Sequence, residues 1–171
     1  MAKIEFTLVG PGENGNAKLK AKAPKTRPCG LAYDFFTLED VAIPLNQPTL
    51  IYTGVELSKK PRGLEACDAS IDDEEFYNVK LDNNEADLAD DKQIKFVFTW
   101  NKPFPKDEKL PKGWSIRNRD EKGRFIKAVL VIAAHTKIGG IAMCDKKSGK
   151  PVEVEVVVKE PKQPRKAKVA K

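Results

Sequence analysis

Alternating apolar and polar residues run through much of the chain and predict β-strands. Near the start, Ile4, Phe6 and Leu8 are separated by polar residues, which is the two-residue period of a strand with one buried face. Only residues 85–92 have the composition of a short helical turn. Further strands are predicted where the same pattern is bounded by Pro, Gly, Asn or Asp, at residues 49–57, 76–81, 94–100, 125–134 and 152–158. We therefore predict an all-β fold, either a compact sandwich or a barrel.

Turn-forming sequences predict two hairpins. The Gly- and Asn-rich segment 10–16 is followed by the alternating residues 17–21, which are expected to pair back on strand 4–8. Near the end, the turn sequence 146–150 separates an apolar run from residues 152–156, in which Val alternates with Glu. That alternation places one face of the last strand inward and the other in solvent.

Strand alternation also predicts the core. The apolar residues at every second position of each strand are expected to point inward, where burial of apolar area stabilises the fold. The residues expected inside are Phe6, Leu8, Ile51, Val79, Phe96, Phe98, Val129, Val131, Val154 and Val156.

The chain is long enough for one domain with a buried core. It has 171 residues, of which 40% are hydrophobic and 33% charged, and domains commonly hold about 100–200 residues. We expect one β domain over residues 1–158 and a basic, flexible arm over residues 159–171. No stretch approaches the ~20 apolar residues of a membrane-spanning helix, and the first residues lack the apolar core of a secretory signal. We expect no membrane partner and a cytoplasmic location.

The net charge of +6 is unevenly distributed. Residues 159–171 hold six basic residues and one acid, a net +5, whereas residues 65–91 hold eleven acids and one Lys, a net −10. The rest of the chain therefore carries +11. Such separation favours contact with nucleic acid or complementary contacts between subunits, although a solvated surface without a partner has the same composition.

Basic residues near aromatic residues mark a candidate binding surface. Arg117, Arg119 and Arg124 lie close in sequence to Trp114 and Phe125, in a Pro-containing stretch that is expected to run over the surface as a loop. Arginines hold phosphates and aromatic rings stack on bases in single-strand binders, but an ordinary loop anchored by its aromatics has the same residues. In the arm, the candidates for binding nucleic acid or a neighbouring subunit are Lys162, Arg165, Lys166 and Lys168.

Few residues offer chemistry of other kinds. Cys29, Cys67 and Cys144 are odd in number and far apart, which predicts reduced, mostly buried thiols rather than a disulfide framework or a zinc site. The single histidine, His135, follows an apolar run and is interpreted as a strand-end residue. The acids at 72–75 lack the spacing of a calcium-binding loop. These residues predict no metal site and no cofactor.

Part of the chain resembles a known enzyme family. The residues concerned are Ala32-Tyr33-Asp34-Phe35, then Glu39-Asp40-Val41-Ala42-Ile43-Pro44, then Leu50-Ile51-Tyr52-Thr53-Gly54-Val55. They are similar in order and spacing to the first motif and following hairpin of the dUTPase and dCTP deaminase family, and the resemblance extends over roughly residues 24–79. It implies a β-clip barrel and a homotrimer. Residues 40–43 and 50–55 are expected to form paired strands across the turn between them.

The resemblance also implies site residues. Asp34 would support magnesium-bound phosphates, Asp72 would prepare the attacking water, and Tyr77, two positions later than in the family motif, would pack on the nucleotide sugar. The phosphate-binding second motif has no counterpart at residues 65–70, where acids stand, and the glycine-rich closing arm of the family is missing. Phosphoryl chemistry depends on charge neutralisation by metal ions and cationic groups, so half of this apparatus is absent from the sequence.

Two functions follow from these observations. The first is a non-enzymatic binding or assembly protein on a dUTPase-like β fold, whose basic arm and charged surfaces contact other subunits or nucleic acid, by analogy with phage virion proteins. Its location would then be a virion or the cytoplasm. The alternative is a divergent dUTP pyrophosphatase that requires magnesium. The missing motifs favour the first function.

Overall fold

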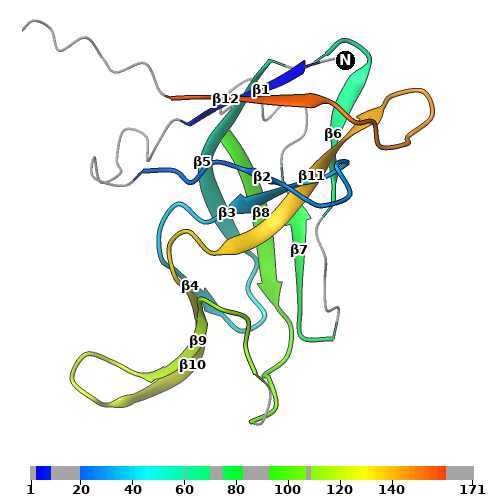
Figure 1. The fold of residues 1–171 in the computed structure, drawn as a ribbon. Helices are drawn as coiled ribbons and strands as arrows, with labels where there is room; N and C mark the ends of the chain where they lie inside the picture. Colours follow the sequence, from blue (N-terminus) through cyan, green and yellow to red (C-terminus); the bar gives the residue numbers. More distant parts are fainter. Residues whose placement is uncertain are drawn as a thin grey trace, which may run out of the picture.

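The computed structural model describes residues 3–8, 20–59, 61–69, 75–82, 93–106 and 109–160. Within these ranges the regular elements are all β-strands (Figure 1), which confirms the predicted fold class. No helix in the described part could cross a membrane. The predicted helical turn at 85–92 lies outside the described residues. The strands are β1 (Lys3–Leu8), β2 (Lys25–Thr26), β3 (Tyr33–Phe36), β4 (Val41–Pro44), β5 (Thr49–Lys59), β6 (Leu64–Asp68), β7 (Tyr77–Leu81), β8 (Gln93–Trp100), β9 (Trp114–Arg119), β10 (Phe125–Ile132), β11 (Lys137–Asp145) and β12 (Glu155–Lys159).

Hydrogen bonding divides the strands into three sheets. The first has the order β12-β1-β5-β8-β7, the second β2-β3-β11-β6, and the third β4-β10-β9. Figure 1 shows the β9–β10 ribbon of the third sheet projecting away from the other two sheets. Because β9 is an edge strand and β4 is shorter than β10, the outer part of this hairpin has no further strand beside it in the described structure.

The first strand lies inside a sheet. It pairs in parallel with β12, where Ile4 lies opposite Val156, and antiparallel with β5 on its other side. Both of its edges are therefore occupied, and the predicted hairpin between β1 and residues 17–21 is wrong. Of that segment the structure describes Lys20 and Ala21, which belong to no strand.

Strands β4 and β5 belong to different sheets. β4 pairs with β10, whereas β5 pairs with β1 and β8, so the predicted pairing of residues 40–43 with 50–55 is wrong. The turn between them instead carries the chain from the third sheet to the first. Gly54 in β5 has a φ of 72°, and a Cβ there would lie 2.8 Å from Ala21 Cβ and 2.9 Å from Leu38 Cδ1. Glycine therefore permits both the backbone angle and the close packing at this point.

The inner face of β10 is opposite to the prediction. Leu130 and Ile132 are fully buried, whereas Val129 and Val131 are only partly buried. Leu130 lies opposite Ile43 of β4, which is also fully buried, and this pairing fixes the inner face. The prediction failed because every residue from 128 to 134 is apolar, and alternation cannot identify the inner face of a continuous apolar run.

The other predicted core residues lie inside. Phe6 contacts the ring of Phe35 edge-on with centroids 5.4 Å apart, and Phe35 contacts Phe96 at 6.1 Å. These contacts join the first sheet to the second. Val156 is partly buried against this core. The predicted residues that are buried are Phe6, Leu8, Ile51, Val79, Phe96, Phe98 and Val154.

The turn after β11 forms as predicted, but the segment that follows it pairs with β11 only briefly. The N–H of Gly149 donates to the carbonyl of Asp145 at 2.7 Å, and the N–H of Val152 donates to the carbonyl of Met143 at 2.8 Å. The chain then departs, and β12 begins at Glu155 to pair with β1. It ends at Lys159, so the sheet extends one residue into the predicted arm.

Candidate functional site

Asp34 lies on β3 between two basic side chains. Arg27 Nε is 2.6 Å from Asp34 Oδ1, and Lys137 Nζ is 3.6 Å from Asp34 Oδ2. The Arg27 and Asp34 side chains are only 17% and 13% exposed, so this pair is less screened by salt than a surface pair. Both oxygens of the carboxylate that the resemblance assigns to magnesium-bound phosphates therefore contact cationic side chains.

Strand pairing explains why these side chains meet. β2, just before Arg27, and β11, which begins at Lys137, flank β3 on its two edges. Gly140 of β11 lies opposite Asp34. A Cβ at Gly140 would collide with Arg27 Nη2 and lie 2.9 Å from the carbonyl oxygen of Tyr33. Glycine at this position lets the guanidinium lie against β11 while it reaches Asp34.

A cavity of about 380 Å³ lies beside this ion pair. Its lining includes three basic side chains, Arg27, Lys112 and Lys137, and the rings of Tyr77 and Trp114. Cationic and aromatic groups in one lining suit an anionic ligand that also has an apolar or aromatic part. None of these basic residues was a predicted site residue, because they come from three segments that only the fold brings together.

Tyr77 is held by other aromatic rings. Its ring stacks on Phe98 with centroids 5.3 Å apart and an interplanar angle of 3°, and it contacts Trp114 edge-on at 4.9 Å. Tyr77 also lines the cavity to which the Asp34 partner Arg27 contributes. The structure thus brings two of the three residues implied by the resemblance to one region. Asp72, the third, lies outside the described residues.

The segment at the place of the second family motif is a regular strand. β6 pairs with β11 continuously, from Leu64 opposite Asp145 to Asp68 opposite Ile141. The next residue, Ala69, donates its N–H to the carbonyl of Gly140 at 2.9 Å. The backbone of this segment is therefore used in hydrogen bonds to β11. Its last residue, Asp68, is an acid.

The predicted surface loop around the arginines is a β-hairpin. Residues 114–119 form β9, which was not among the predicted strands, and β9 pairs with β10. At the tip, the N–H of Gly123 donates to the carbonyl of Asp120 at 3.0 Å, and the N–H of Asp120 donates to the carbonyl of Arg124 at 2.9 Å. Gly123 has a φ of 79°, which is the left-handed conformation of the bulge residue in three-residue hairpin loops.

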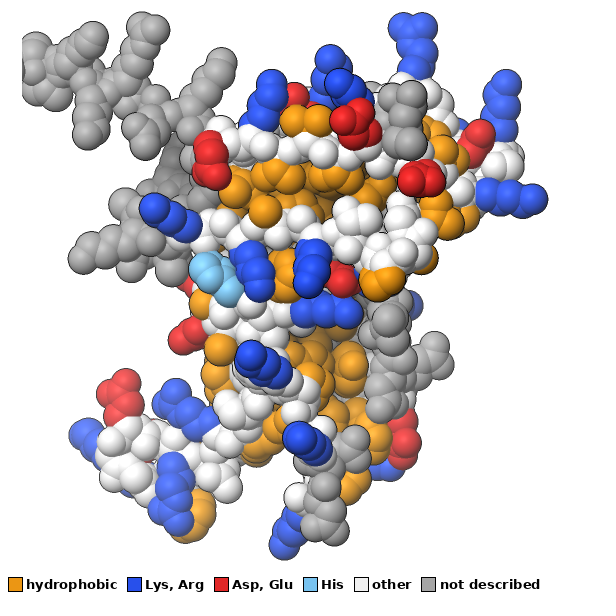
Figure 2. Space-filling model, in the orientation of Figure 1, with side chains coloured by type: hydrophobic (Ala, Val, Ile, Leu, Met, Phe, Trp, Pro, Cys, Tyr) orange, Lys and Arg blue, Asp and Glu red, His pale blue; other side chains and the backbone are white. Residues whose placement is uncertain are grey.

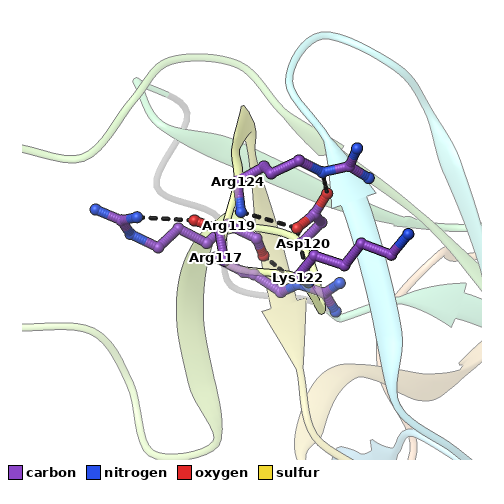
Figure 3. Close-up of polar contacts among 6 residues, drawn as sticks. Arg117, Arg119, Asp120, Lys122 and Arg124 are labelled. Atoms are coloured by element: carbon purple, nitrogen blue, oxygen red, sulfur yellow. Dashed lines mark hydrogen bonds and ion pairs between the residues drawn. The ribbon is translucent and has the colours of Figure 1, made fainter.

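Asp120 organises this tip. Its Oδ1 accepts the backbone N–H groups of Lys122 at 2.8 Å and Arg124 at 2.9 Å, and its Oδ2 accepts Arg124 Nε at 2.8 Å (Figure 3). The backbone hydrogen bond from Arg124, followed by its side-chain hydrogen bond, holds the pKa of Asp120 below its ordinary value. The tip is therefore a bonded turn, and it sets the direction of the neighbouring side chains.

The hairpin also holds the other two arginines. Arg117 Nε donates to the carbonyl of Arg119 at 3.0 Å, and Arg119 Nη1 donates to the carbonyl of Gly123 at 2.8 Å. The guanidinium carbon of Arg119 lies 3.9 Å from the centroid of the Phe125 ring. Figure 3 shows the charged ends of these side chains fanned out around the turn. The structure thus brings the predicted residues Arg117, Arg119 and Arg124 together.

Charge gathers on this projection. Residues 114–127 hold five basic residues and two acids, a net +3, and Figure 2 shows several basic side chains, in blue, and an acidic one, in red, on the projecting part of the molecule. Phe125 is 73% exposed among them. The arm candidates Lys162, Arg165, Lys166 and Lys168 lie outside the described residues. A sequence signal for the hairpin was present, because Asp120 and Gly123 occupy the ends of a favoured loop.

The three cysteines are free. Cys29 is exposed, Cys67 is partly buried and Cys144 is buried, so the prediction of mostly buried thiols holds fully only for Cys144. Burial, and then a hydrogen bond with Cys67, raises the pKa of Cys144 to about 12. The predicted strand-end residue His135 lies in the turn after β10 with a φ of 61°, and its Nε2 is 2.7 Å from the carbonyl oxygen of Lys20.

Comparison with known proteins finds similarity in three dimensions only. No protein-family model and no curated protein sequence matches the chain. Among solved structures, the dUTPase of S. aureus phage phi11 matches with a TM-score of 0.53 and 17% identity, covering 89% of this chain and 96% of that one. A mutant of the dUTPase of Staphylococcus bacteriophage 80alpha, with dUpNHpp, matches with a TM-score of 0.51 and 16% identity, covering 89% and 88%.

A second mutant of the 80alpha dUTPase has a TM-score of 0.51 and 15% identity, and again 89% of this chain is covered, with 96% of that one. The matches span most of both chains. At this identity they establish the architecture and leave the chemistry of the site open. The chain has the fold of the phage dUTPases, as the motif resemblance predicted.

Proposed function

We propose that this chain is a non-enzymatic binding or assembly protein that uses a dUTPase-like fold as its scaffold. The observation that carries the proposal is the ion pairing of Asp34 with Arg27 and Lys137. A carboxylate that helps to hold magnesium on phosphates must offer its lone pairs to the metal or to its bound water. Here both oxygens already contact cations of the same chain.

A second observation supports the proposal from another part of the fold. The residues at the place of the phosphate-binding motif form the regular strand β6 and end in an acid, Asp68. A carboxylate repels a triphosphate, and phosphoryl transfer needs cationic groups held around the transferring group. In this reading the cluster at Asp34 is structural, and function is carried by charged surfaces.

The partners we propose are other copies of this chain, as a homotrimer, and nucleic acid. The uneven charge and the basic β9–β10 hairpin support a polyanionic partner. One of the matched phage dUTPases has an SaPI-inducing capacity as well as its enzymatic activity, so a protein with this fold can have a role beyond its enzymatic activity. A virion or a cytoplasmic nucleoprotein complex would be the site of action.

An assay for pyrophosphate release from dUTP with magnesium tests the proposal. We expect no turnover above that of a heat-denatured sample. Turnover that is abolished in Asp72→Asn and retained after deletion of residues 161–171 would instead establish the alternative, a divergent dUTP pyrophosphatase. Light scattering during size-exclusion chromatography tests the homotrimer independently, because three copies of a 19.0 kDa chain differ clearly in mass from one.

A further inference from the structure

Residues of one kind gather on one face of the β9–β10 hairpin. In an antiparallel pair, residues directly opposite each other project from the same face. Arg119 lies opposite Phe125 and Arg117 lies opposite Val129. Arg117 and Arg119 are two residues apart on β9 and project from the same side of that strand, and the register of β10 shifts between Phe125 and Val129. The other face carries the buried Leu130 and Ile132, so this face is turned away from the core.

The aromatic ring on this face, that of Phe125, is exposed to solvent and is not packed in the core. Phe125 is 73% exposed, and Arg119 lies over its ring at 3.9 Å. The guanidinium of Arg119 is itself fixed by the hydrogen bond to the carbonyl of Gly123. One planar apolar surface is thereby held in solvent beside a planar cation, with little side-chain entropy left to lose on binding.

The same hairpin carries two further arginines. Arg117 and Arg124 each use Nε in a hydrogen bond to the hairpin, which leaves their terminal nitrogens directed outward from exposed side chains. Guanidinium groups bind phosphates through paired donors. The carboxylate of Asp120 accepts hydrogen bonds from the backbone of the tip. It therefore repels an incoming anion less than a carboxylate without such bonds would.

We infer that the outer face of the β9–β10 hairpin binds single-stranded nucleic acid, with a base stacked on Phe125 and the neighbouring phosphates on Arg117, Arg119 and Arg124. This inference rests on the proposed binding function. A duplex offers phosphates but no open base face, so it would use the arginines and leave the ring of Phe125 exposed. An acidic protein segment would likewise use only the charges.

The test is binding of a short labelled oligothymidylate and of a duplex of equal length by the full-length protein across a salt series. Phe125→Ala is expected to weaken oligothymidylate binding by about 5- to 150-fold, the range of one base stacked on an aromatic ring. It should leave the slope of log affinity against log salt unchanged. Arg117→Ala is expected to reduce that slope by about 0.7, as loss of one phosphate contact does for a single strand.

Matched controls come from elsewhere on the surface. Tyr52→Ala removes a 40% exposed ring from β5, and Lys147→Ala removes a cation from the β11 turn; neither should change the affinity. Because Phe125 is exposed, its variant should keep the melting temperature of the unaltered protein. Equal binding by Phe125→Ala and the unaltered protein, tighter binding of the duplex, or loss of self-association in place of nucleic-acid binding would overturn the inference. None of these outcomes depends on the dUTP assay, so the two proposals fail separately.

Discussion

Arg27 and Asp34 form an ion pair at 2.6 Å that is largely shielded from solvent, with side-chain exposures of 17% and 13%. Pairing of this kind changes what a carboxylate does. An exposed acid contributes to solubility and can accept a metal ion, whereas a shielded acid that has lost its partner must bear its desolvation cost. Asp34 should therefore matter to the fold in a way that surface acids do not.

Removing the cation of this pair should destabilise the protein. Arg27→Met keeps much of the side-chain bulk but leaves the Asp34 oxygen without its closest partner, and we expect the free energy of unfolding to fall by about 1–3 kcal/mol. Lys3→Met is the matched control, because the Lys3–Glu155 pair is 4.0 Å long and 66% and 54% exposed; its effect should stay below about 1 kcal/mol. Urea denaturation measures both, and equal effects would show that the shielded pair contributes no more than a surface pair.

Truncating two neighbouring side chains to Ala tests which face of β10 points into the core. Leu130→Ala removes a fully buried side chain and should cost about 2–5 kcal/mol. Val131→Ala removes a partly buried side chain from the outer face and should cost clearly less. If urea denaturation gives the reverse order, the pairing of Leu130 with Ile43 is not the one in solution.

Cys144 should resist alkylation and make stability depend on alkaline pH. Its pKa of about 12 lies above the ordinary thiol value of 9.0, so the folded protein keeps a proton that the unfolded chain releases. This contribution is complete below pH 9.0 and is lost as the pH rises toward about 12. We expect rapid labelling of the exposed Cys29 and slow labelling of Cys144 by iodoacetamide. Cys144→Ala should flatten the alkaline decline in melting temperature, and an unchanged decline would assign it to other groups.

Deleting residues 161–171 should alter binding more than stability. This segment has five basic residues, no acid and little apolar surface, so its contacts with a partner should be mainly electrostatic and weakened by salt. We expect an unchanged melting temperature, weaker association with nucleic acid or an acidic subunit surface, and a flatter salt dependence. Calorimetry and a salt titration measure these quantities. An unfolded truncated protein would show that the segment packs on the domain.

The sequence predicted strands best where apolar and polar residues alternate. β1, β5 and β8 follow this rule, and Ile4, Ile51 and Phe96 lie inside as a result. For β11 the sequence predicted only the apolar run before the turn at 146–150, because Gly139 and Gly140 lower the strand propensity of its first half. They are tolerated because the Arg27 side chain closes over Gly140, a relation between distant segments that local patterns do not contain.

The candidate site was predictable only in part, for a similar reason. Motif resemblance identified Asp34 and Tyr77, but their neighbours Arg27, Lys112 and Lys137 have no pattern of their own. The three hairpin arginines were named from their spacing to aromatic residues, while their arrangement depends on the bonded turn at Asp120. Charge can be read from composition, but whether an acid neutralises a neighbour or turns inward depends on the backbone that holds it.

The parallel pairing of β1 with β12 places Lys3 opposite Glu155, which couples the earliest described strand to the last. During synthesis at about 5–20 residues per second, β1 emerges many seconds before its partner exists. Until then β1 is itself the edge strand and exposes unpaired N–H and C=O groups, which invite strand addition from other chains. Contacts between such distant segments also slow folding. Newly made chains should therefore depend on chaperone protection until synthesis is nearly complete.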